Sequence, residues 1–186
     1  MPQLLSFPKH QVPRDIAIQI RSYYRIQWSH VHARSGTLWN YAADNPLRPI
    51  NFVLMEDEAL ISHAEANWRT IEFGGGSFTC GGLSGVFTYP AWRGSGLAKD
   101  VVRAATDALN QSDADLAILF CGPRLRNFYS ECGWTPMDSA RILFGDPTNP
   151  QQDKTGQIMM LFPSPKGRLI QDRLLSEPLY VGALTW

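Results

Sequence analysis

The sequence predicts a mixed α/β (α+β) fold, built on a mixed β-sheet with one parallel β-α-β unit at its centre. Two observations carry this prediction. A strand-like run over residues 83–89 stops at Pro90 and is followed by an amphipathic helix over residues 97–109, and then by the buried strand ADLAILFCG. Around this unit the segments follow the order helix, hairpin strands, strand, helix, strand, helix, strands.

The segments before the central unit predict one helix and one hairpin. Residues 14–32 form the helix, because apolar side chains recur there at close to helical spacing. These side chains are Ile16, Ile20, Tyr23, Tyr24 and Trp28. Residues 50–73 contain two β-like runs around an acidic turn at residues 56–58, which predicts the hairpin. The stretch GGGSFTCGG then reads as a flexible hairpin turn rather than a phosphate cradle, since no helix follows it.

The segments after the central unit predict a short helix and further strands. The helix lies around PRLRNFYSECGW, with Gly133 placed as its C-terminal stop. A turn-rich stretch over residues 145–156 precedes the buried strand QIMMLFP, and the last strand-like stretch is EPLYVGALTW.

Length and composition favour one soluble domain spanning residues 1–186. The chain has 186 residues, of which 44% are hydrophobic, which suits one well-buried core. Lys and Arg together number 17, as do Asp and Glu, so no basic excess points to nucleic acid. The 3 cysteines lack the close spacing of a zinc site or disulfide framework, which indicates no metal and a reduced, cytoplasmic protein. Pro8 and Lys9 interrupt the N-terminal apolar run, so no membrane anchor is expected.

The junction after the strand is suited to an anion. It reads RGSGLA from Arg93 to Ala98, so glycines open the backbone just where a helix N-terminus presents its N–H groups. The third glycine of a dinucleotide fingerprint is missing, and no Gly-Lys-Ser/Thr forms a P-loop.

Taken with its flanks, this junction resembles the pyrophosphate loop of the GNAT superfamily of acyl-CoA-dependent N-acetyltransferases. The loop fits the pattern Arg/Gln-x-x-Gly-x-Gly/Ala, and NFYSECGW resembles the family's second signature. The resemblance implies a GNAT-type mixed sheet with helices on both faces, and acetyl-CoA as the acyl donor. It also implies that strand backbone groups hold the pantetheine arm and that loop N–H groups hold the pyrophosphate. The positions concerned are Val86, Phe87 and Thr88 for the arm, and Arg93, Gly94, Ser95, Gly96, Leu97 and Ala98 for the pyrophosphate.

The same resemblance places Tyr129 near the thioester sulfur. A tyrosine hydroxyl of pKa ~10 stays protonated at neutral pH and can supply a proton to a thiolate leaving group. The backbone N–H after Gly85 can polarise the acyl carbonyl in the manner of an oxyanion hole.

A finer resemblance is to the aminoglycoside 2'-N-acetyltransferases. It is carried by GVFTYPAWRG, FYSECGW, DKTGQIMMLFP and the terminal tryptophan. It implies substrate contacts at Ser84, Gly85 and Trp186. The sequence departs from that pattern at Ser84 and Leu184, where acidic residues are expected, and at Gly122, where many GNAT proteins carry asparagine.

Each site assignment has a purely structural alternative. The loop can be a tight strand-to-helix turn, Tyr129 a packed helix residue, and Trp186 a residue that closes the core. His63 fits a hydrogen-bonded sheet residue better than a base. Glu65 and Glu72 lie seven apart on one strand and thus on opposite faces, so only one of them can face a cleft. The aromatic residues of the first helix suit either the core or an acceptor pocket.

The expected activity is transfer of acetyl from acetyl-CoA to a primary amine of a small molecule, by direct attack, with Tyr129 as general acid. The alternative is a non-catalytic domain of the same fold that binds acyl-CoA as a sensor or scaffold. The expected partner is the amine, with neither nucleic acid nor membrane. The oligomeric state stays open, with a homodimer as one option.

Overall fold

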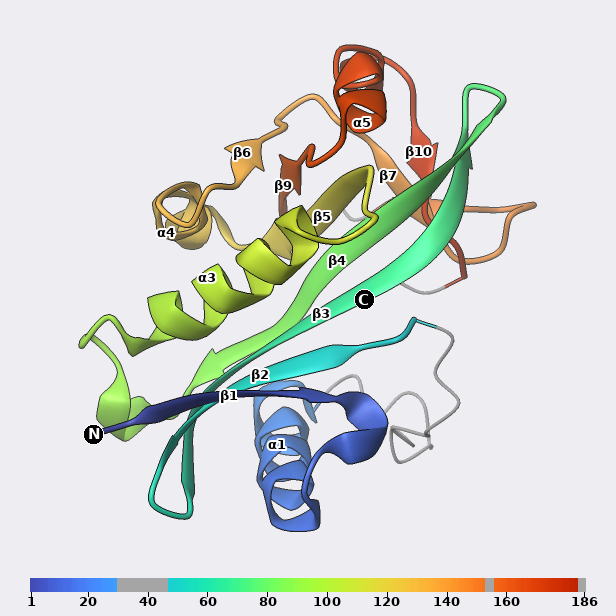
Figure 1. Ribbon diagram of the computed structural model, residues 1–186. Coiled ribbons are helices and arrows are strands. Elements are labelled where there is room, and N and C mark those ends of the chain that lie inside the picture. The colour runs from blue at the N-terminus through green and yellow to red at the C-terminus, as the bar shows by residue number, and fades with distance from the viewer. Residues whose placement is uncertain (30–46, 153–155, 184–186) are drawn as a thin grey trace.

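The computed structural model describes residues 1–29, 47–152 and 156–183, and a mixed sheet runs through the centre of this part of the chain (Figure 1). Its seven strands follow the spatial order β1-β2-β3-β4-β5-β9-β6. They are β1 (Gln3–Pro8), β2 (Ile50–Glu56), β3 (Ala59–Phe73), β4 (Gly76–Thr88), β5 (Leu116–Cys121), β9 (Gln157–Leu161) and β6 (Thr135–Pro136). A smaller sheet has the order β10-β7-β8 and consists of β10 (Leu179–Tyr180), β7 (Ile142–Phe144) and β8 (Gln151–Gln152).

Helices connect and cover these strands. The α-helices are α1 (Arg14–Gln27), α3 (Leu97–Asn110), α4 (Arg126–Ser130) and α5 (Pro165–Leu169). Short 3-10 turns are η1 (Lys9–Gln11), η2 (Pro90–Trp92), η3 (Pro123–Leu125) and η4 (Arg173–Leu175). None of the helices in the described ranges has the length and apolar character needed to cross a membrane.

The predicted central β-α-β unit is confirmed. Strands β4 and β5 run parallel and are connected through α3, whereas the other neighbours in the main sheet are antiparallel. A parallel pair needs such a crossover, because a tight turn can join only antiparallel strands. Strand β5 is buried apart from the half-buried Phe120, as expected for the middle of a covered sheet.

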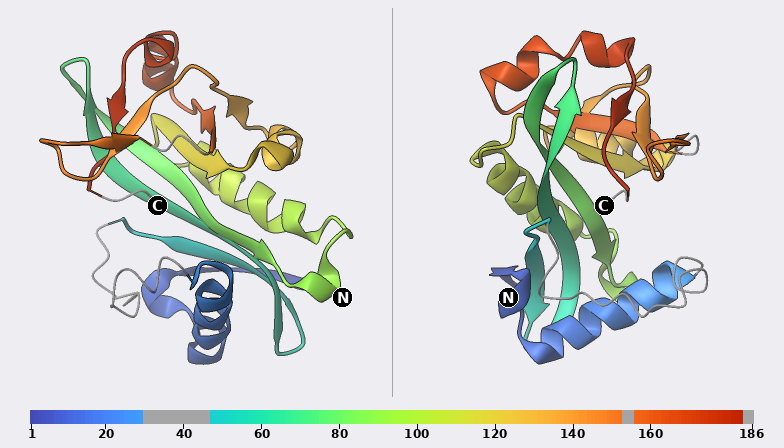
Figure 2. Two further views of the ribbon diagram at one scale, coloured as in Figure 1. Left: turned by 180° about the vertical axis from the view of Figure 1, so that it is seen from behind. Right: turned by 90° about the vertical axis from the view of Figure 1, so that its right-hand side faces the viewer.

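The two long helices cover opposite faces of the sheet (Figure 2). Helix α3 buries Val101, Ala105 and Leu109 in a cluster with residues of β3 and β5. Helix α1 buries Ile16 and Ile20 in a separate cluster with residues of β2, β3 and β4. The described sheet therefore has a core on each side, which confirms the predicted mixed α/β fold.

Helix α1 also confirms the predicted amphipathic pattern, although it is shorter than predicted. Ile16, Ile20, Tyr23 and Tyr24 are its buried residues. The helix ends at Gln27, and Trp28 is half-buried at its C-terminal cap. The last residues of the predicted span, 30–32, lie outside the described residues.

Strands β4 and β5 separate part-way along their length. Their ladder consists of Cys80↔Leu116, Gly81↔Ala117 and Gly82↔Ile118, after which β5 continues against β9. From Leu83 onward, the edge of β4 that faced β5 thus has no ladder partner among the described strands. This end of β4 continues through η2 to the start of α3.

The prediction that GGGSFTCGG forms a flexible turn is wrong beyond Gly75. Only Gly74 and Gly75 lie in the turn, with φ of 58° and 80°, and β4 begins at Gly76. Gly81 is a strand residue paired with Trp68 and Ala117, and α3 packs closely against it: a Cβ atom there would lie 2.6 Å from Cδ2 of the buried Leu109. Glycine within a strand here indicates a close approach, not flexibility.

Two features at the ends of the described chain also differ from the prediction. Gln3–Pro8 forms the edge strand β1, paired with β2, although the sequence pattern gave no strand there. Within the described residues up to 183, the strand part of the predicted last strand is Leu179–Tyr180, which pairs with β7 in the smaller sheet rather than extending the main one. A two-residue strand such as β10 carries too little alternation to be recognised from sequence, and QLLSFP of β1 does not alternate between apolar and polar residues.

Helix α5 sits directly on the start of β5. Ser164 caps the helix by accepting a hydrogen bond from Gly167 N, and its Oγ donates to Oδ1 of Asp115. Asp115 Oδ2 also accepts from Thr79 N of β4 at 3.0 Å. A Cβ atom on Gly167 would lie 1.7 Å from the Asp115 carbonyl oxygen, so only glycine fits this contact.

We predict that Gly167→Ala lowers stability by about 3 kcal/mol, because overpacking against backbone cannot be relieved by a side-chain rotation. For a chain of this size the melting temperature should fall by roughly 6–12 °C. The matched control is Gly122→Ala, where a Cβ atom meets nothing within 4 Å. Thermal unfolding of both variants checks the prediction, and equal melting temperatures would contradict it.

Candidate functional site

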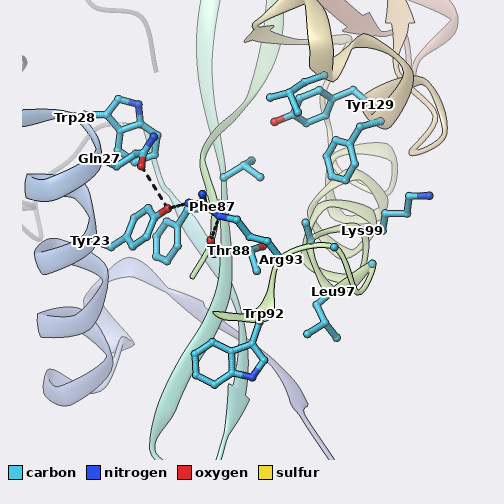
Figure 3. Close-up of a pocket in the computed structure, with 16 residues that line it drawn as sticks. Tyr23, Gln27, Trp28, Phe87, Thr88, Trp92, Arg93, Leu97, Lys99 and Tyr129 are labelled. Carbon is cyan, nitrogen blue, oxygen red and sulfur yellow. Dashed lines mark hydrogen bonds between the residues drawn. The ribbon is translucent and has the colours of Figure 1, made fainter. Parts of the chain in front are cut away.

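A cavity of about 650 Å³ lies beside the end of β4 that has no β5 partner. Four segments line it: α1, the end of β4, the turn into α3, and the η3–α4 segment (Figure 3). The lining residues are Tyr23, Gln27, Trp28, Val86, Phe87, Thr88, Trp92, Arg93, Gly94, Gly96, Leu97, Ala98, Lys99, Leu125, Phe128 and Tyr129.

The cavity brings together most of the residues singled out from sequence. Val86 to Thr88, Tyr129 and all of the Arg93–Ala98 loop except Ser95 lie in its wall. Ser95 turns away, and its hydroxyl donates to the Trp92 carbonyl at 2.7 Å. Ser84 and Gly85 lie next to the wall on β4 but outside it, and Trp186 lies outside the described residues.

The glycines of the loop keep its backbone open. Gly94 and Gly96 both have φ of 83°, the left-handed region that favours glycine, and a Cβ atom on either would meet nothing within 4 Å. Gly96 is the N-cap of α3 and, having no side chain, leaves the first N–H groups of the helix without a side-chain cap. The loop therefore presents backbone donors and the positive end of the helix dipole to the cavity.

Arg93 ties this loop to two other elements. Its Nε donates to the Thr88 carbonyl at 2.9 Å, and one terminal nitrogen donates to the Tyr23 hydroxyl at 2.7 Å. That hydroxyl in turn lies 3.5 Å from Oε1 of Gln27 (Figure 3). The guanidinium thus supplies charge at the cavity and also fixes the loop against β4 and α1.

Tyr129 stands on the opposite wall, on α4. The side chain is buried, and its hydroxyl is directed across the cavity toward β4 (Figure 3). Burial raises the pKa of Tyr129 well above its usual value, with a further contribution from the thiols of Cys121 and Cys132. The hydroxyl therefore stays protonated over the physiological range and can donate a hydrogen bond or a proton.

Aromatic side chains form the α1 side of the site. The Tyr23 and Phe87 rings are stacked with centroids 3.9 Å apart, and Tyr24 meets Trp28 edge-on at 5.1 Å. Tyr23 and Trp28 line the cavity, while Tyr24 is buried against Phe87 and His63. The sequence left open whether these aromatic residues belong to the core or to a pocket. The structure places Tyr24 in the core and Tyr23 and Trp28 in the pocket wall.

His63 is a hydrogen-bonded sheet residue, as the sequence favoured. The side chain is 0% exposed, with Nδ1 2.7 Å from the Gly85 carbonyl oxygen and Nε2 2.9 Å from the Asn51 side-chain amide. Burial lowers its pKa to about 4, so the ring is neutral at pH 7. Both ring nitrogens are occupied, which argues against a role as the base.

The two carboxylates of β3 have opposite environments. Glu72 is exposed, whereas Glu65 is buried and pairs in register with Ser84. Ser84 Oγ lies 3.4 Å from Glu65 Oε1, and Lys9 Nζ lies 3.8 Å from Oε2. Burial lowers the pKa of Lys9 to about 8. The sequence gave no sign of Lys9, because only the pairing of β1 and β2 and the turn after β1 bring it beside β3.

Other lining residues were also missed by the sequence analysis. Leu125 and Phe128 precede Tyr129 by four and one positions in a helical turn, and Trp92 precedes the loop. Their spacing from the two signatures is the signal that could have found them. Among the described residues, no group of three or more His, Cys, Asp or Glu side chains is arranged to hold a metal ion.

A family model described as "Acetyltransferase (GNAT) domain" matches residues 17–137. The chain belongs to the GNAT acetyltransferase family. Membership of this family makes the protein an acyltransferase, and members of the family bind acyl-CoA. The match is at the level of the superfamily and does not single out the aminoglycoside-modifying members. A comparison with curated protein sequences returned no match.

Solved structures similar to this GNAT protein agree with its fold. ElaA from Escherichia coli has a TM-score of 0.60 at 11% identity, covering 86% of this chain and 99% of its own. A GNAT family N-acetyltransferase, YhbS from Escherichia coli in complex with CoA, has a TM-score of 0.58 at 17% identity, covering 97% and 90%. An acyl-CoA N-acyltransferase from Pseudomonas aeruginosa has a TM-score of 0.58 at 10% identity, covering 86% and 99%.

Proposed function

We propose that this protein transfers an acetyl group from acetyl-CoA to a primary amine of a small molecule by direct attack, with Tyr129 as general acid. The observation that carries the proposal is that one cavity has the glycine loop of α3 in one wall and the Tyr129 hydroxyl in another. A donor held at the loop by its phosphates can extend its thioester toward Tyr129 along the separated edge of β4.

The loop and the strand supply complementary contacts to CoA. The N–H groups of Gly94 to Ala98 suit the pyrophosphate, because bare backbone donors at a helix N-terminus favour anions. The edge of β4 from Val86 to Thr88 has no β5 partner, so the Val86 N–H and C=O and the Thr88 N–H are available to the amide groups of the pantetheine arm, while the Thr88 carbonyl accepts from Arg93 Nε. These are the contacts that a strand would otherwise make.

The chemistry follows from groups at the end of this path. The amine nitrogen attacks the acyl carbon, and the carbon–sulfur bond breaks as the C–N bond is completed. The Val86 N–H stabilises negative charge on the carbonyl oxygen. Tyr129 gives its proton to the departing thiolate and regains one from solvent after the thiol leaves. Its raised pKa ensures that the hydroxyl carries this proton when the reaction begins. The attacking nitrogen loses its proton to water.

The acceptor side favours an amine with an apolar portion. Tyr23 and Trp28 present aromatic surface to the cavity, and the stacked Phe87 supports it. Glu65, the strand partner of Ser84, already faces Lys9 and is not available to pair several ligand cations. Charged groups entering a cleft must be paired, so a polycation fits poorly here.

A second candidate is a non-catalytic acyl-CoA-binding domain of the same family. It is favoured by Gly122, which stands where many GNAT proteins carry an asparagine. The position has room for a side chain, because a Cβ atom there would meet nothing within 4 Å. Thiol release from acetyl-CoA, measured across a panel of amines, separates the two functions. Release above the hydrolytic background with at least one amine supports the enzyme, and binding without release supports the sensor.

We predict that Gly96→Glu removes the rise in melting temperature that CoA causes in the wild type, because a carboxylate at the helix N-terminus repels the phosphates. The matched control is Gly75→Glu, in the remote β3–β4 turn, which has a similar φ of 80° and equal space. Gly96→Gln separates bulk from charge. Thermal shift with CoA is the measurement, and a full shift in a folded Gly96→Glu variant would contradict the loop assignment.

We predict that Tyr129→Phe lowers kcat by something like 10²-fold or more while acetyl-CoA affinity changes little, since only the hydroxyl is lost. The control is Tyr180→Phe, which removes another hydroxyl, bonded to the Gly145 carbonyl at 2.6 Å. Steady-state kinetics and calorimetry on both variants check this. A loss below threefold with an active substrate means that Tyr129 is structural.

We predict that aminoglycosides such as kanamycin are poor acceptors and that arylalkyl or other small monoamines are better. The aromatic wall favours an acceptor with an apolar portion, and Glu65 is already paired with Lys9 and so cannot pair several ligand cations. The test compares kcat/KM for both classes under the same conditions. An aminoglycoside value near ~10⁴ M⁻¹s⁻¹ or above, typical of real substrates, overturns this prediction.

A further inference from the structure

A β-bulge lies beside the cavity, where β3 and β4 change register. The pairing passes from His63↔Phe87 to Glu65↔Ser84, so Gly85 and Val86 of β4 both lie opposite Ala64 of β3. A bulge of this kind disrupts the ladder locally and leaves an extra residue unpaired. Here the Gly85 carbonyl oxygen is met by a side chain, His63 Nδ1, at 2.7 Å.

The His63 ring is fixed in place from several sides. It stacks on Phe87 with centroids 5.1 Å apart and an interplanar angle of 23°, and Tyr24 meets it edge-on at 5.8 Å. A carbonyl oxygen only accepts, so the neutral ring carries its proton on Nδ1 and donates it to Gly85. Nε2 then accepts from the side-chain amide of Asn51, which can present either its oxygen or its nitrogen.

The position of the Gly85 carbonyl determines where the next N–H points. The peptide between Gly85 and Val86 is trans and planar, so the N–H of Val86 is directed opposite to the carbonyl. The ladder agrees, because Tyr89 N donates to the Ile61 carbonyl of β3 at 3.0 Å and N–H directions alternate along a strand. The Val86 N–H therefore points away from β3, toward the side where β5 has separated and Tyr129 lies.

The conformation at Gly85 is also specific to this packing. Its φ is 59°, and a Cβ atom there would lie 1.8 Å from the Tyr24 hydroxyl oxygen. Glycine is thus required both for the backbone angle and for space. Tyr24 and His63 together confine the peptide whose N–H faces the cavity.

We propose that His63 is a positioning residue for acyl transfer. By holding the Gly85 carbonyl at the bulge, it directs the Val86 N–H at the carbonyl oxygen of the bound thioester. This inference rests on the proposed function, because it assigns the geometry of the same site. His63 touches no substrate in this arrangement and acts only through the peptide that it holds.

The test uses three variants at position 63 that differ in which hydrogen bond they keep. His63→Asn places an amide N–H₂ where Nδ1 stood and can still donate to the Gly85 carbonyl. His63→Gln reaches instead toward Asn51 and loses the bond to Gly85. His63→Leu loses both bonds, and His63→Gln supplies the same loss at Gly85 if His63→Leu does not fold.

The first readout is binding without an acceptor amine, measured by calorimetry with acetyl-CoA and with S-ethyl-CoA, which lacks the carbonyl. The wild type should prefer acetyl-CoA by roughly fivefold, the scale of one hydrogen bond. His63→Asn should keep that preference, whereas His63→Gln and His63→Leu should lose it with S-ethyl-CoA affinity unchanged. An unchanged preference in His63→Gln, or no preference in the wild type, overturns the inference.

The second readout is the infrared carbonyl band of bound acetyl-CoA labelled with ¹³C at the thioester carbon. Polarisation by an N–H lowers this frequency, so the band should shift down in the wild type and in His63→Asn, and not in His63→Gln. A purely structural role for His63 would not move the band while the protein stays folded. If the wild type binds neither CoA derivative, the proposed function itself fails. If it binds both and the carbonyl band shifts equally in all variants, only the role of His63 fails.

Discussion

The separation of β4 from β5 is the constraint on which the described site depends. Two parallel strands that stayed paired would satisfy each other's backbone groups and close the space between them. Here the ladder ends at Gly82↔Ile118, and the far end of β4 keeps an edge of donors and acceptors beside a cavity. Such an edge needs polar partners, because unpaired buried backbone groups are costly. On its other edge β5 stays paired with β9 from Ala117 to Cys121, and α4 places Tyr129 on the far wall of the cavity.

The loop at the start of α3 is held by contacts outside itself. Arg93 joins it to the end of β4 and to Tyr23 of α1, and Tyr23 stacks on Phe87 of the same strand. The wall that suits the donor and the wall that suits the acceptor are therefore connected through one guanidinium and one aromatic pair. A movement of α1 would therefore displace the loop directly, through the contact between Tyr23 and Arg93.

The charged side chains that line the described cavity, Arg93 and Lys99, are both basic and lie at the loop that opens α3. Around Gly85 the charges are paired instead, since Glu65 beside Ser84 faces Lys9 of the turn after β1. Burial keeps both His63 and Tyr129 neutral at physiological pH, the former by lowering its pKa to about 4 and the latter by raising it. Directed dipoles rather than net charge thus dominate the region around Gly85 and Val86, where a carbonyl oxygen is to be polarised.

The sequence by itself determined the parts of this protein that depend on neighbouring residues. The amphipathic α3, the strand that stops before Pro90 and the glycines of the loop are local patterns, because helix periodicity and backbone freedom are set within a few positions. These patterns predicted the central β-α-β unit and a loop suited to binding phosphate. The same local logic misjudged the stretch after Gly75, where strand pairing and the approach of Leu109 override the flexibility of glycine.

Only the tertiary structure decided which of these residues meet. Tyr129 reaches the cavity because η3 and α4 follow the end of β5 that has left β4, and Lys9 reaches Glu65 because β1 pairs at the edge of the sheet. The bulge at Gly85 and Val86 arises from the register of two strands, which no single-strand pattern contains. His63 read from sequence is one more residue of an apolar strand. Its bond to the Gly85 carbonyl exists because packing of α1 and two strands encloses the ring, and contacts of that range are not encoded in local spacing.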